Sequence, residues 1–297
     1  MTDHPANQSS DPAARHKGDR PEHRHADWRG GVAGDAALLA LAGRLASAAA
    51  DAILAIRARG FETFTKADSS PVTAADHAAE ALILEGLRAH SLIPVIAEEE
   101  VAAGIAIAPG SCFWLVDPLD GTREFAAGSE NFTVNIGLVR DRRCVLGAVA
   151  LPAFGSLYLG WNPADGPGLA TRADAAGTRN VAARLPPSEG LTVLASRHYA
   201  DDPALRAYLG RQPIAALGNI GSAAKFVRVA EGAADLYPRL GPTMEWDTAA
   251  PQAVVEAAGG SVRLFDGGTL DYGKPGFLNP HFVCRGRHGA ESFDARS

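Results

Sequence analysis

The segment WLVDPLDGTREF, residues 114–125, constrains the fold more than any other part of this sequence, because a buried strand ends there on two acids. Trp114 and the two residues after it predict the strand, and Asp117 and Asp120 follow with only a proline and a leucine between them. Like charges so close together repel each other. The loop is therefore either a tight polar turn or a site for a positively charged partner.

Helix and strand patterns surround this loop. We expect a long helix over 32–59 that ends at Gly60, and a second helix that Thr73 and Asp76 open with a capping box. A short apolar strand then ends on three glutamates, 98–100. An antiparallel meander should follow the loop, and strands and helices should alternate in the C-terminal part. The expected strands are 132–139, 144–151, 156–161, 191–196, 234–238 and 261–265, and the expected later helices are 222–232 and 247–258.

Composition divides the chain into four parts. Residues 1–30 are polar and carry as many acidic as basic side chains, so we expect a disordered tail without a catalytic role. Residues 31–161 are expected to form an N-terminal α+β subdomain with the acidic loop, and residues 191–297 a C-terminal α/β subdomain. The Gly-, Pro- and Ala-rich stretch 162–190 between them should be a surface excursion. The two subdomains together should make one catalytic domain.

Charge and cysteine usage exclude several classes of function. The formal net charge of −6 gives no broad attraction for nucleic acid polymers. Charged residues such as Asp35, Arg44 and Asp51 interrupt the apolar helix 32–59, so we expect neither a secretory signal nor a membrane span. The three cysteines should be reduced core residues, which favours the cytoplasm. They are Cys112, Cys144 and Cys284. Peripheral association with the inner membrane and the oligomeric state stay open.

Four acids stand where strands end or helices begin, which is where α/β proteins assemble their sites. They are Glu98, Asp117, Asp120 and Asp247. Each alone has an ordinary explanation, since Asp247 is a good N-cap, Asp120 and Gly121 make a common turn, and Glu98 could lie on a solvated edge. If the four converge, about four positive charges must compensate them, and two Mg²⁺ ions would supply these. The Leu119 carbonyl could be a further oxygen ligand.

Several stretches of the chain resemble a known family. DPLDGTREF resembles the D-P-[LI]-D-G-T signature of the inositol monophosphatase superfamily, and WDTAAPQAVVEAAGG resembles its second signature. Residues 68–76 and the segments SENFTVNIGLV and DLYPRLGPTMEWDTAA are most similar to the 3′(2′),5′-bisphosphate nucleotidase branch (CysQ type). The similarity covers residues 35–285. It implies an αβαβα layered sandwich of the inositol monophosphatase and fructose-1,6-bisphosphatase type, and a Mg²⁺-dependent, lithium-sensitive phosphatase. The implied reaction converts adenosine 3′,5′-bisphosphate to AMP in sulfate assimilation, with the sulfated analogue PAPS as a second substrate.

The resemblance also implies roles for individual residues. A first Mg²⁺ falls to Glu98, Asp117 and the Leu119 carbonyl, and a second to Asp117, Asp120 and Asp247. Thr122 and Asp76 match the pair that orients and deprotonates the attacking water, although Asp76 also has its place in the capping box. Glu99 matches a residue beside a third, weaker metal position.

The chemistry supports a phosphatase apart from the resemblance. In-line attack on a phosphate monoester needs an activated water, a base for its proton, and positive charge at the entering and leaving oxygens. Gly221 and Ser222 stand at an expected helix start, where free N–H groups attract an anion. Lys225 and Arg239 could bind a second phosphate, or they could be ordinary solvated cations. The expected substrate-binding residues are Glu98, Leu119, Asp120, Gly121, Thr122, Ser222, Lys225, Arg239 and Asp247.

Two departures from the family pattern concern substrate contacts. Nucleotidases commonly read S-R-S-H where this chain has Ser196, Arg197, His198 and Tyr199, so the nucleotide-contacting histidine position holds a tyrosine. Arg123 stands where lysine is also common. Two alternatives therefore stay open beside the nucleotidase: a phosphatase acting on inositol or other sugar phosphates, and a non-enzymatic protein that binds divalent cations. Thr122 and Asp76 argue against the latter, because a structural metal site does not need a water-activating pair.

Overall fold

Two β-sheets form the frame that positions the acidic loop. The computed structural model describes residues 32–66, 71–105, 107–196, 203–210 and 212–287, so the predicted tail lies outside the described residues. The first sheet has seven strands in the order β3-β4-β5-β6-β7-β8-β9, and only the β3–β4 pair is parallel. Its strands are β3 (Val95–Ala97), β4 (Cys112–Asp120), β5 (Thr133–Arg140), β6 (Arg143–Leu151), β7 (Ser156–Trp161), β8 (Leu169–Asp174) and β9 (Gly177–Asn180). The predicted meander is confirmed as β5 to β7.

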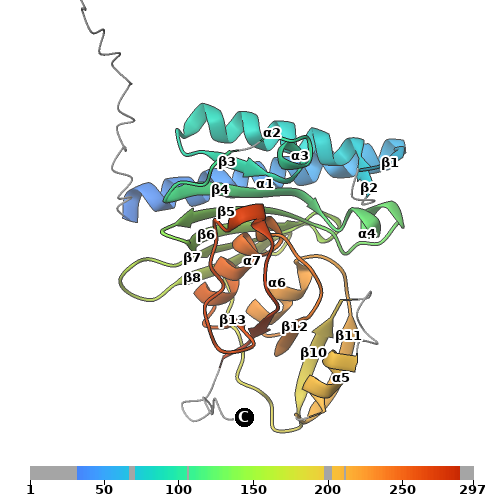
Figure 1. Cartoon of the computed structure of the whole chain (residues 1–297), viewed down its shortest axis with the longest axis vertical. Coiled ribbons are helices and arrows are strands. Elements are labelled where there is room, and N and C mark those ends of the chain that lie inside the picture. The colour runs from blue at the N-terminus through green and yellow to red at the C-terminus, as the bar shows by residue number, and fades with distance from the viewer. Residues whose placement is uncertain (1–31, 67–70, 106, 197–202, 211, 288–297) are drawn as a thin grey trace, which may run out of the picture.

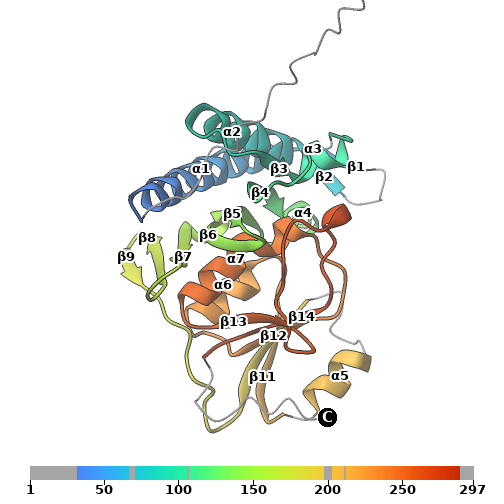
Figure 2. The ribbon, with the colours of Figure 1, turned by 60° about the vertical axis from the view of Figure 1, so that its left-hand side comes forward.

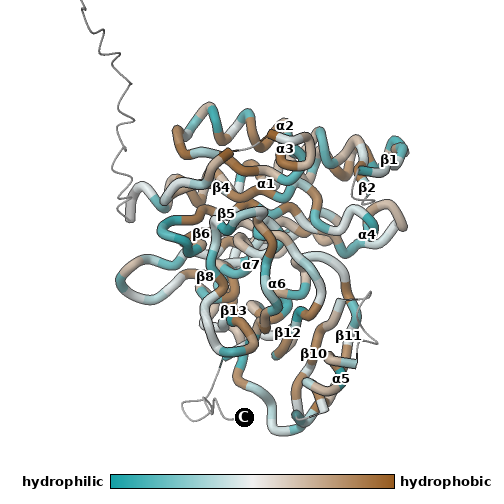
Figure 3. Tube along the Cα trace, viewed as in Figure 1, coloured by the Kyte–Doolittle hydropathy of each residue, from teal (hydrophilic) through white to brown (hydrophobic). Residues whose placement is uncertain are grey.

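Two long helices cover one face of this sheet (Figure 1). α1 (Val32–Arg59) and α2 (Ala74–His90) pack against each other and bury small and branched side chains against the strands, among them Ala46, Ile53 and Ile83. Hydrophobic and hydrophilic residues alternate along α2 in Figure 3, as expected for a helix with one face on the core.

The first of these helices also has the length and composition of a membrane span. Residues Gly34–Arg59 have a mean hydropathy of 1.6. In the structure, however, the buried stripe of α1 faces the sheet. We therefore assign α1 as a core helix.

The capping box predicted at the start of α2 is confirmed. Thr73 is the last residue of β2 (Pro71–Thr73), which pairs with β1 (Thr63–Thr65). It is also the N-cap of α2. The Asp76 Oδ2 atom accepts hydrogen bonds from the Thr73 backbone N and from its Oγ1, each at 2.7 Å. The carboxylate of Asp76 is therefore fixed, and its second oxygen points away from the cap.

The second sheet lies beyond two further helices, which Figure 2 shows between the sheets. α6 (Ala224–Ala230) and α7 (Glu245–Ala257) contribute to a core shared with both sheets. The second sheet has the order β11-β10-β12-β14-β13, and α5 (Pro203–Leu209) packs on its outer face. Its strands are β10 (Leu191–Ala195), β11 (Ile214–Asn219), β12 (Leu236–Arg239), β13 (Ser261–Leu264) and β14 (Phe282–Arg285). The layers are thus α, β, α, β, α, as the resemblance implied.

Some details differ from the sequence-based expectation. The stretch 162–190 carries the hairpin β8–β9, which extends the first sheet before the chain crosses to the second. The helices α3 (Glu98–Ala102), α4 (Thr122–Ala126) and α5, the strands β11 and β14, and the short 3-10 turns η1 (Pro152–Phe154) and η3 (Pro275–Phe277) were not predicted. The three cysteines are free and buried, which confirms their assignment to the core.

Candidate metal centre and active site

The acidic loop is formed by an irregular end of β4. The pairing of β4 with β5 shifts register between Asp117 and Asp120, and the Leu119 N–H donates to Asp117 Oδ1 at 3.0 Å. Gly121 then adopts a positive φ of 93°, and it lies so close to the segment before β5 that a Cβ atom would be 3.1 Å from the Asn131 carbonyl oxygen. The chain can therefore turn directly from the strand into α4 at this glycine, and both aspartates stay at the end of the sheet.

Three of the predicted metal ligands come together. Glu98, Asp117 and Asp247 each place a carboxylate oxygen within 4.8 Å of the other two. They reach this point from α3, β4 and α7 respectively. The helix expected from 247 begins two residues earlier, at Glu245. The ordinary alternative for Asp247, an N-cap, is therefore wrong, and the Met244 N–H donates to Asp247 Oδ2 at 2.9 Å. Glu98 is likewise the first residue of a helix and does not lie on a strand edge.

The electrostatics of this cluster favour a cation. Burial raises the pKa of Asp117 well above its ordinary value, and the neighbouring acids Glu98, Asp120 and Asp247 raise it further. Burial and the charges of Asp120 and Glu98 raise the pKa of Asp247 in the same way. Carboxylates that repel one another in a buried site are suited to hold a hard divalent ion, which prefers oxygen ligands. The donor set of Glu98, Asp117 and Asp247 therefore fits a divalent cation such as Mg²⁺.

Asp120 lies in the same site but is held by different partners. Its Oδ2 atom accepts from the Ala223 N–H and, at 3.3 Å, from the Thr133 hydroxyl. Burial raises the pKa of Asp120 to about 6, although the Lys225 ammonium and the Ala223 N–H oppose the shift. Asp120 thus connects the acidic loop to the turn before α6.

Thr122 and Asp76, the predicted water-activating pair, are in direct contact. The Thr122 hydroxyl donates to Asp76 Oδ1 at 2.9 Å and lies 3.1 Å from the Leu119 carbonyl oxygen. Because the capping box occupies Asp76 Oδ2, the other carboxylate oxygen is available to Thr122. Asp76 therefore accepts hydrogen bonds from the helix cap and from Thr122 at the same time.

A lysine that was not identified from the sequence contacts two of the predicted site residues. Lys66 Nζ lies 2.6 Å from Glu98 Oε1 and 2.6 Å from Glu99 Oε1. Although burial opposes the charged ammonium, these two glutamates keep the pKa of Lys66 above its ordinary value. The Glu99 backbone N–H donates to Glu80 Oε2 at 2.8 Å, and burial raises the pKa of Glu80 to about 7. Lys66 stands 32 residues before Glu98, so no local sequence pattern connects them.

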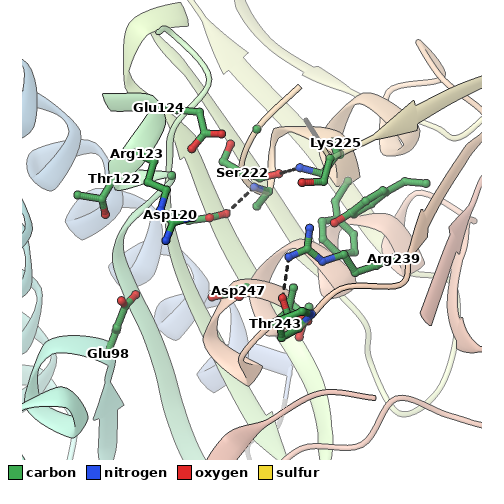
Figure 4. A pocket seen from close by; sticks show the side chains of 18 of the residues that line it. Glu98, Asp120, Thr122, Arg123, Glu124, Ser222, Lys225, Arg239, Thr243 and Asp247 are labelled. Atoms are coloured by element: carbon green, nitrogen blue, oxygen red, sulfur yellow. Dashed lines mark hydrogen bonds between the residues drawn. The ribbon is translucent and has the colours of Figure 1, made fainter. Parts of the chain in front are cut away.

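A pocket of about 400 Å³ opens above the acids, and Figure 4 shows the side chains around it. The predicted substrate-binding residues that line it are Glu98, Asp120, Gly121, Thr122, Ser222, Lys225, Arg239 and Asp247. Further lining residues include Ser196, Arg123, Glu124, Tyr237 and Thr243. Asp117, Leu119, Asp76 and Glu99 are not among the lining residues. The pocket is therefore lined by both acids and cations, with Lys225 and Arg239 lying across it from Glu98 in Figure 4.

The two predicted cations differ in their surroundings. Lys225 is 3% exposed, and its Nζ donates to the carbonyls of Ile220 at 3.1 Å and Ser222 at 2.7 Å. Burial lowers the pKa of Lys225 to about 8, although Asp120 opposes the shift. Arg239 donates from Nη2 to the Pro242 carbonyl at 2.7 Å and lies beside Thr243 in Figure 4. Lys225 thus orders the turn before α6.

Two expectations about substrate contacts have different outcomes. Ser222 precedes α6 with a positive φ of 53°, and α6 itself begins only at Ala224, so the helix start expected at 222 was placed two residues too early. Arg197, His198 and Tyr199 lie outside the described residues, whereas Ser196 lines the pocket. The contact that replaces the family's histidine therefore stays a prediction.

Comparisons with known proteins agree with this geometry. Residues 35–292 match the inositol monophosphatase family. The 3′(2′),5′-bisphosphate nucleotidase CysQ of Salmonella typhimurium is 43% identical over 243 residues, which are 80% of this chain and 96% of that protein. The 3′-phosphoadenosine 5′-phosphate phosphatase of Mycobacterium leprae is 34% identical, covering 83% of this chain and 88% of the relative.

Solved structures give the same assignment. CysQ from Bacteroides thetaiotaomicron, a bacterial member of the inositol monophosphatase family, matches with a TM-score of 0.70 and 30% identity, over 85% of this chain and 98% of that one. An inositol monophosphatase from Anabaena matches with a TM-score of 0.66 and 25% identity, and the match covers 85% of this chain and 91% of that one. The resemblance found in the signatures is confirmed, and the chain belongs to the inositol monophosphatase family, in its CysQ-type branch.

Proposed function

We propose that this protein is a Mg²⁺-dependent phosphatase that removes the 3′-phosphate of adenosine 3′,5′-bisphosphate to give AMP and inorganic phosphate. The observation that carries the proposal is the convergence of the carboxylates of Glu98, Asp117 and Asp247 beside a pocket that Thr122 lines. The Thr122 hydroxyl is hydrogen-bonded to Asp76. The nucleotide substrate is inferred from relatives named for this activity. PAPS, which carries the same 3′-phosphate, is expected to be a second substrate.

Two Mg²⁺ ions would be held by the acids at the end of β4. We assign one position to Glu98, Asp117 and the Leu119 carbonyl, and the other to Asp117, Asp120 and Asp247. Glu99 would border a third, weaker position, where Lys66 now contacts it. When bound, the ions supply positive charge beside the phosphate and make a water molecule easier to deprotonate.

The chain's own residues supply the base. The Thr122 hydroxyl donates its proton to Asp76 Oδ1, so its lone pairs are free to accept a proton from the attacking water. Asp76, fixed by the cap of α2, can take up the proton that Thr122 passes on. The water oxygen bonds to phosphorus and the bond from phosphorus to O3′ breaks. The leaving O3′ takes up a proton from solvent water, so the ribose hydroxyl is released, and Asp76 returns its proton to solvent.

The second phosphate of the nucleotide needs a cation outside the acidic cluster. Lys225 and Arg239 both line the pocket. Because a guanidinium has five N–H donors in a planar fork that matches phosphate oxygens, we expect Arg239 to contribute more to this recognition than Lys225. Replacing Arg239 by methionine should weaken kcat/KM for adenosine 3′,5′-bisphosphate by about tenfold or more, as for a charge-assisted hydrogen bond of ~1.5–3 kcal/mol. Inositol 1-phosphate, which has a single phosphate, should lose much less.

Lys225→Met provides the contrast. It should reduce turnover of both substrates equally, because it disorders the turn that holds Asp120. Arg239→Met could instead lower kcat/KM for both substrates by the same factor, or for neither substrate. Either result would mean that Arg239 does not recognise the second phosphate. In that case the sugar phosphatase alternative gains support.

The deciding experiment is phosphate release with Mg²⁺ from a substrate panel. The panel contains adenosine 3′,5′-bisphosphate, PAPS, inositol 1-phosphate and fructose 1,6-bisphosphate. We expect the highest kcat/KM for adenosine 3′,5′-bisphosphate. A preference for inositol 1-phosphate or fructose 1,6-bisphosphate would identify a sugar phosphatase, and no turnover of any substrate would favour a non-enzymatic cation-binding protein.

We place this reaction in the cytoplasm, in the removal of a by-product of sulfate assimilation. The free, buried state of the three cysteines is compatible with a reducing compartment. Fractionation of cells and detection of the protein in soluble and membrane fractions tests this location, including the peripheral association with the inner membrane.

A further inference from the structure

Asn135, in the middle of β5, has a buried amide without a partner. The residue is 0% exposed, and neither its Nδ2 nor its Oδ1 atom has a hydrogen-bond partner among the residues that the structure describes. Within that part of the chain it is the one side chain with two such buried atoms. Native proteins pair almost all buried polar groups, so an unpartnered amide indicates that a partner is missing.

The alternation of side chains along β5 shows where this amide points. Val134 and Ile136 belong to the core beneath α1 and α2, so their neighbour Asn135 faces the opposite side of the sheet. Val139, four residues further on the same face, packs with Trp246 of α7. At Gly137, between them, a Cβ atom would meet the backbone N of Ala250 at 2.8 Å. Asn135 therefore lies on the sheet face that α7 covers.

A ligand of the proposed metal centre lies next to this position. Asp117 is the residue directly opposite Asn135 in the β4–β5 register, so the two side chains share one face of the sheet. Thr133, two residues earlier on that face, donates to Asp120. Asp247 is in the first turn of α7. The next turn of the same helix, at Ala249 and Ala250, lies over Gly137. The unpartnered amide thus lies beside Asp117, on the face of the sheet that the helix carrying Asp247 covers.

We propose that Asn135 is a positioning residue of the metal centre. Mg²⁺ commonly keeps several water ligands, and an amide that both donates and accepts can bond to such waters and to the carboxylate of Asp117. Asn135 would then hold Asp117 in the orientation that a bound ion needs. Residues outside the ligand set that orient a ligand typically change metal affinity by ~10–100-fold when they are replaced. The inference rests on the Mg²⁺ dependence proposed above.

The test measures metal affinity directly. Asn135→Leu keeps the size of the side chain and removes both polar atoms. Mg²⁺ affinity is measured from the rise in Tm during a Mg²⁺ titration, and Mn²⁺ affinity from its electron paramagnetic resonance signal. We expect the half-saturating concentrations to rise about tenfold or more, while the metal-free variant is as stable as the wild type or more stable. Asn135→Ser, which is smaller and can bond to water, should be intermediate, and it replaces the leucine variant if that one does not fold.

Gln252→Leu is the matched control. Gln252 is also a buried amide on the α7 side of the sheet, but it is paired, since it accepts from the Tyr272 hydroxyl at 2.7 Å and donates to Glu256 at 3.0 Å. Its replacement should lower Tm without changing the metal affinity. If Asn135→Leu and Asn135→Ser bind Mg²⁺ and Mn²⁺ as the wild type does, Asn135 holds only a structural water and the inference is wrong. If the wild type itself binds neither ion, the proposed function fails with it.

Discussion

Replacement of Asp117 by asparagine should separate stability from activity in this protein. Asp117 is 1% exposed, and its carboxylate accepts one hydrogen bond, from the Leu119 N–H. An asparagine Oδ1 atom can accept the same bond, so the loop should keep its shape. What changes is the charge, because Glu98 and Asp247 lie within 4.8 Å and no longer face a third carboxylate.

The size of the effect can be estimated from these distances. Two unit charges about 4.8 Å apart repel by about 3.5 kcal/mol at an effective dielectric constant near 20, so Asp117 experiences about 7 kcal/mol from its two neighbours. A repelled carboxylate can bind a proton instead, and protonating one aspartic acid near pH 7.5 costs only about 5 kcal/mol. The repulsion therefore cannot destabilise the protein by more than this amount. The ion pair between Lys66 and Glu98 lowers it further. We therefore expect the metal-free variant to be about 2–4 kcal/mol more stable, or ~5–10 °C in Tm.

The assay compares thermal unfolding in EDTA with phosphate release in Mg²⁺. The variant should gain stability and lose nearly all activity, because the ligand shared by both proposed ions has lost its charge. Asp235→Asn is the control, since this buried acid is paired with Arg184 at 2.8 Å, and its replacement should destabilise the protein. The reasoning is refuted if folded Asp117→Asn keeps activity within about tenfold of the wild type, a loss of ~1.4 kcal/mol in the barrier. A fall in metal-free Tm would refute the electrostatic part alone.

Three further predictions follow from the same site. In EDTA, Tm should fall as the pH rises from about 4 through about 6. Burial raises the folded-state pKa of Asp120 to about 6 and also raises those of Asp117 and Asp247, so each acid gives stability that is lost when it ionises. Mg²⁺ should remove this fall, and a flat metal-free profile would contradict it. Li⁺, close to Mg²⁺ in size but with half its charge, should inhibit phosphate release, and equal rates in matched LiCl and KCl would count against two metal positions. Thr122→Val should lower kcat by ~10²–10⁴-fold with little change in Mg²⁺ affinity, whereas Thr122→Ser, which keeps the hydroxyl, should retain most activity. Similar rates in the two variants would exclude a hydroxyl relay to Asp76.

Local patterns in the sequence predicted much of the fold. The capping box at Thr73, the helix ending at Gly60 and the strands of the meander depend on residues close in the chain, and the structure confirms them. The strand β11, which was not predicted, is mostly exposed at the edge of its sheet, and its apolar and polar residues do not alternate. Its conformation is therefore decided by its pairing with β10. The start of α7 was missed because its first turn is fixed by a bond from Met244 to Asp247, which makes the acid the third residue of the helix.

The site shows the same division between local and long-range information. Glu98, Asp117 and Asp247 were identified because acids at strand ends and helix starts are visible in the sequence. Lys66 and Asn135 were not, since a lone lysine and a strand asparagine gain meaning only from neighbours brought by the fold. Lys66 meets Glu98 across 32 residues, and Asn135 meets Asp117 through strand pairing.

The position of α7 depends on glycines that carry no chemistry themselves. Gly137, Gly147 and Gly160 lie side by side on β5, β6 and β7, because each is the register partner of the next. A Cβ atom at Gly137 would lie 2.8 Å from the Ala250 backbone N, and one at Gly147 or Gly160 would come closer still to the backbone of α7. The helix therefore lies directly on the sheet backbone, and any side chain there would lift it away. Because Asp247 is on the first turn of α7 and Asp117 is on the sheet, the distance between these two acids is set by this glycine row.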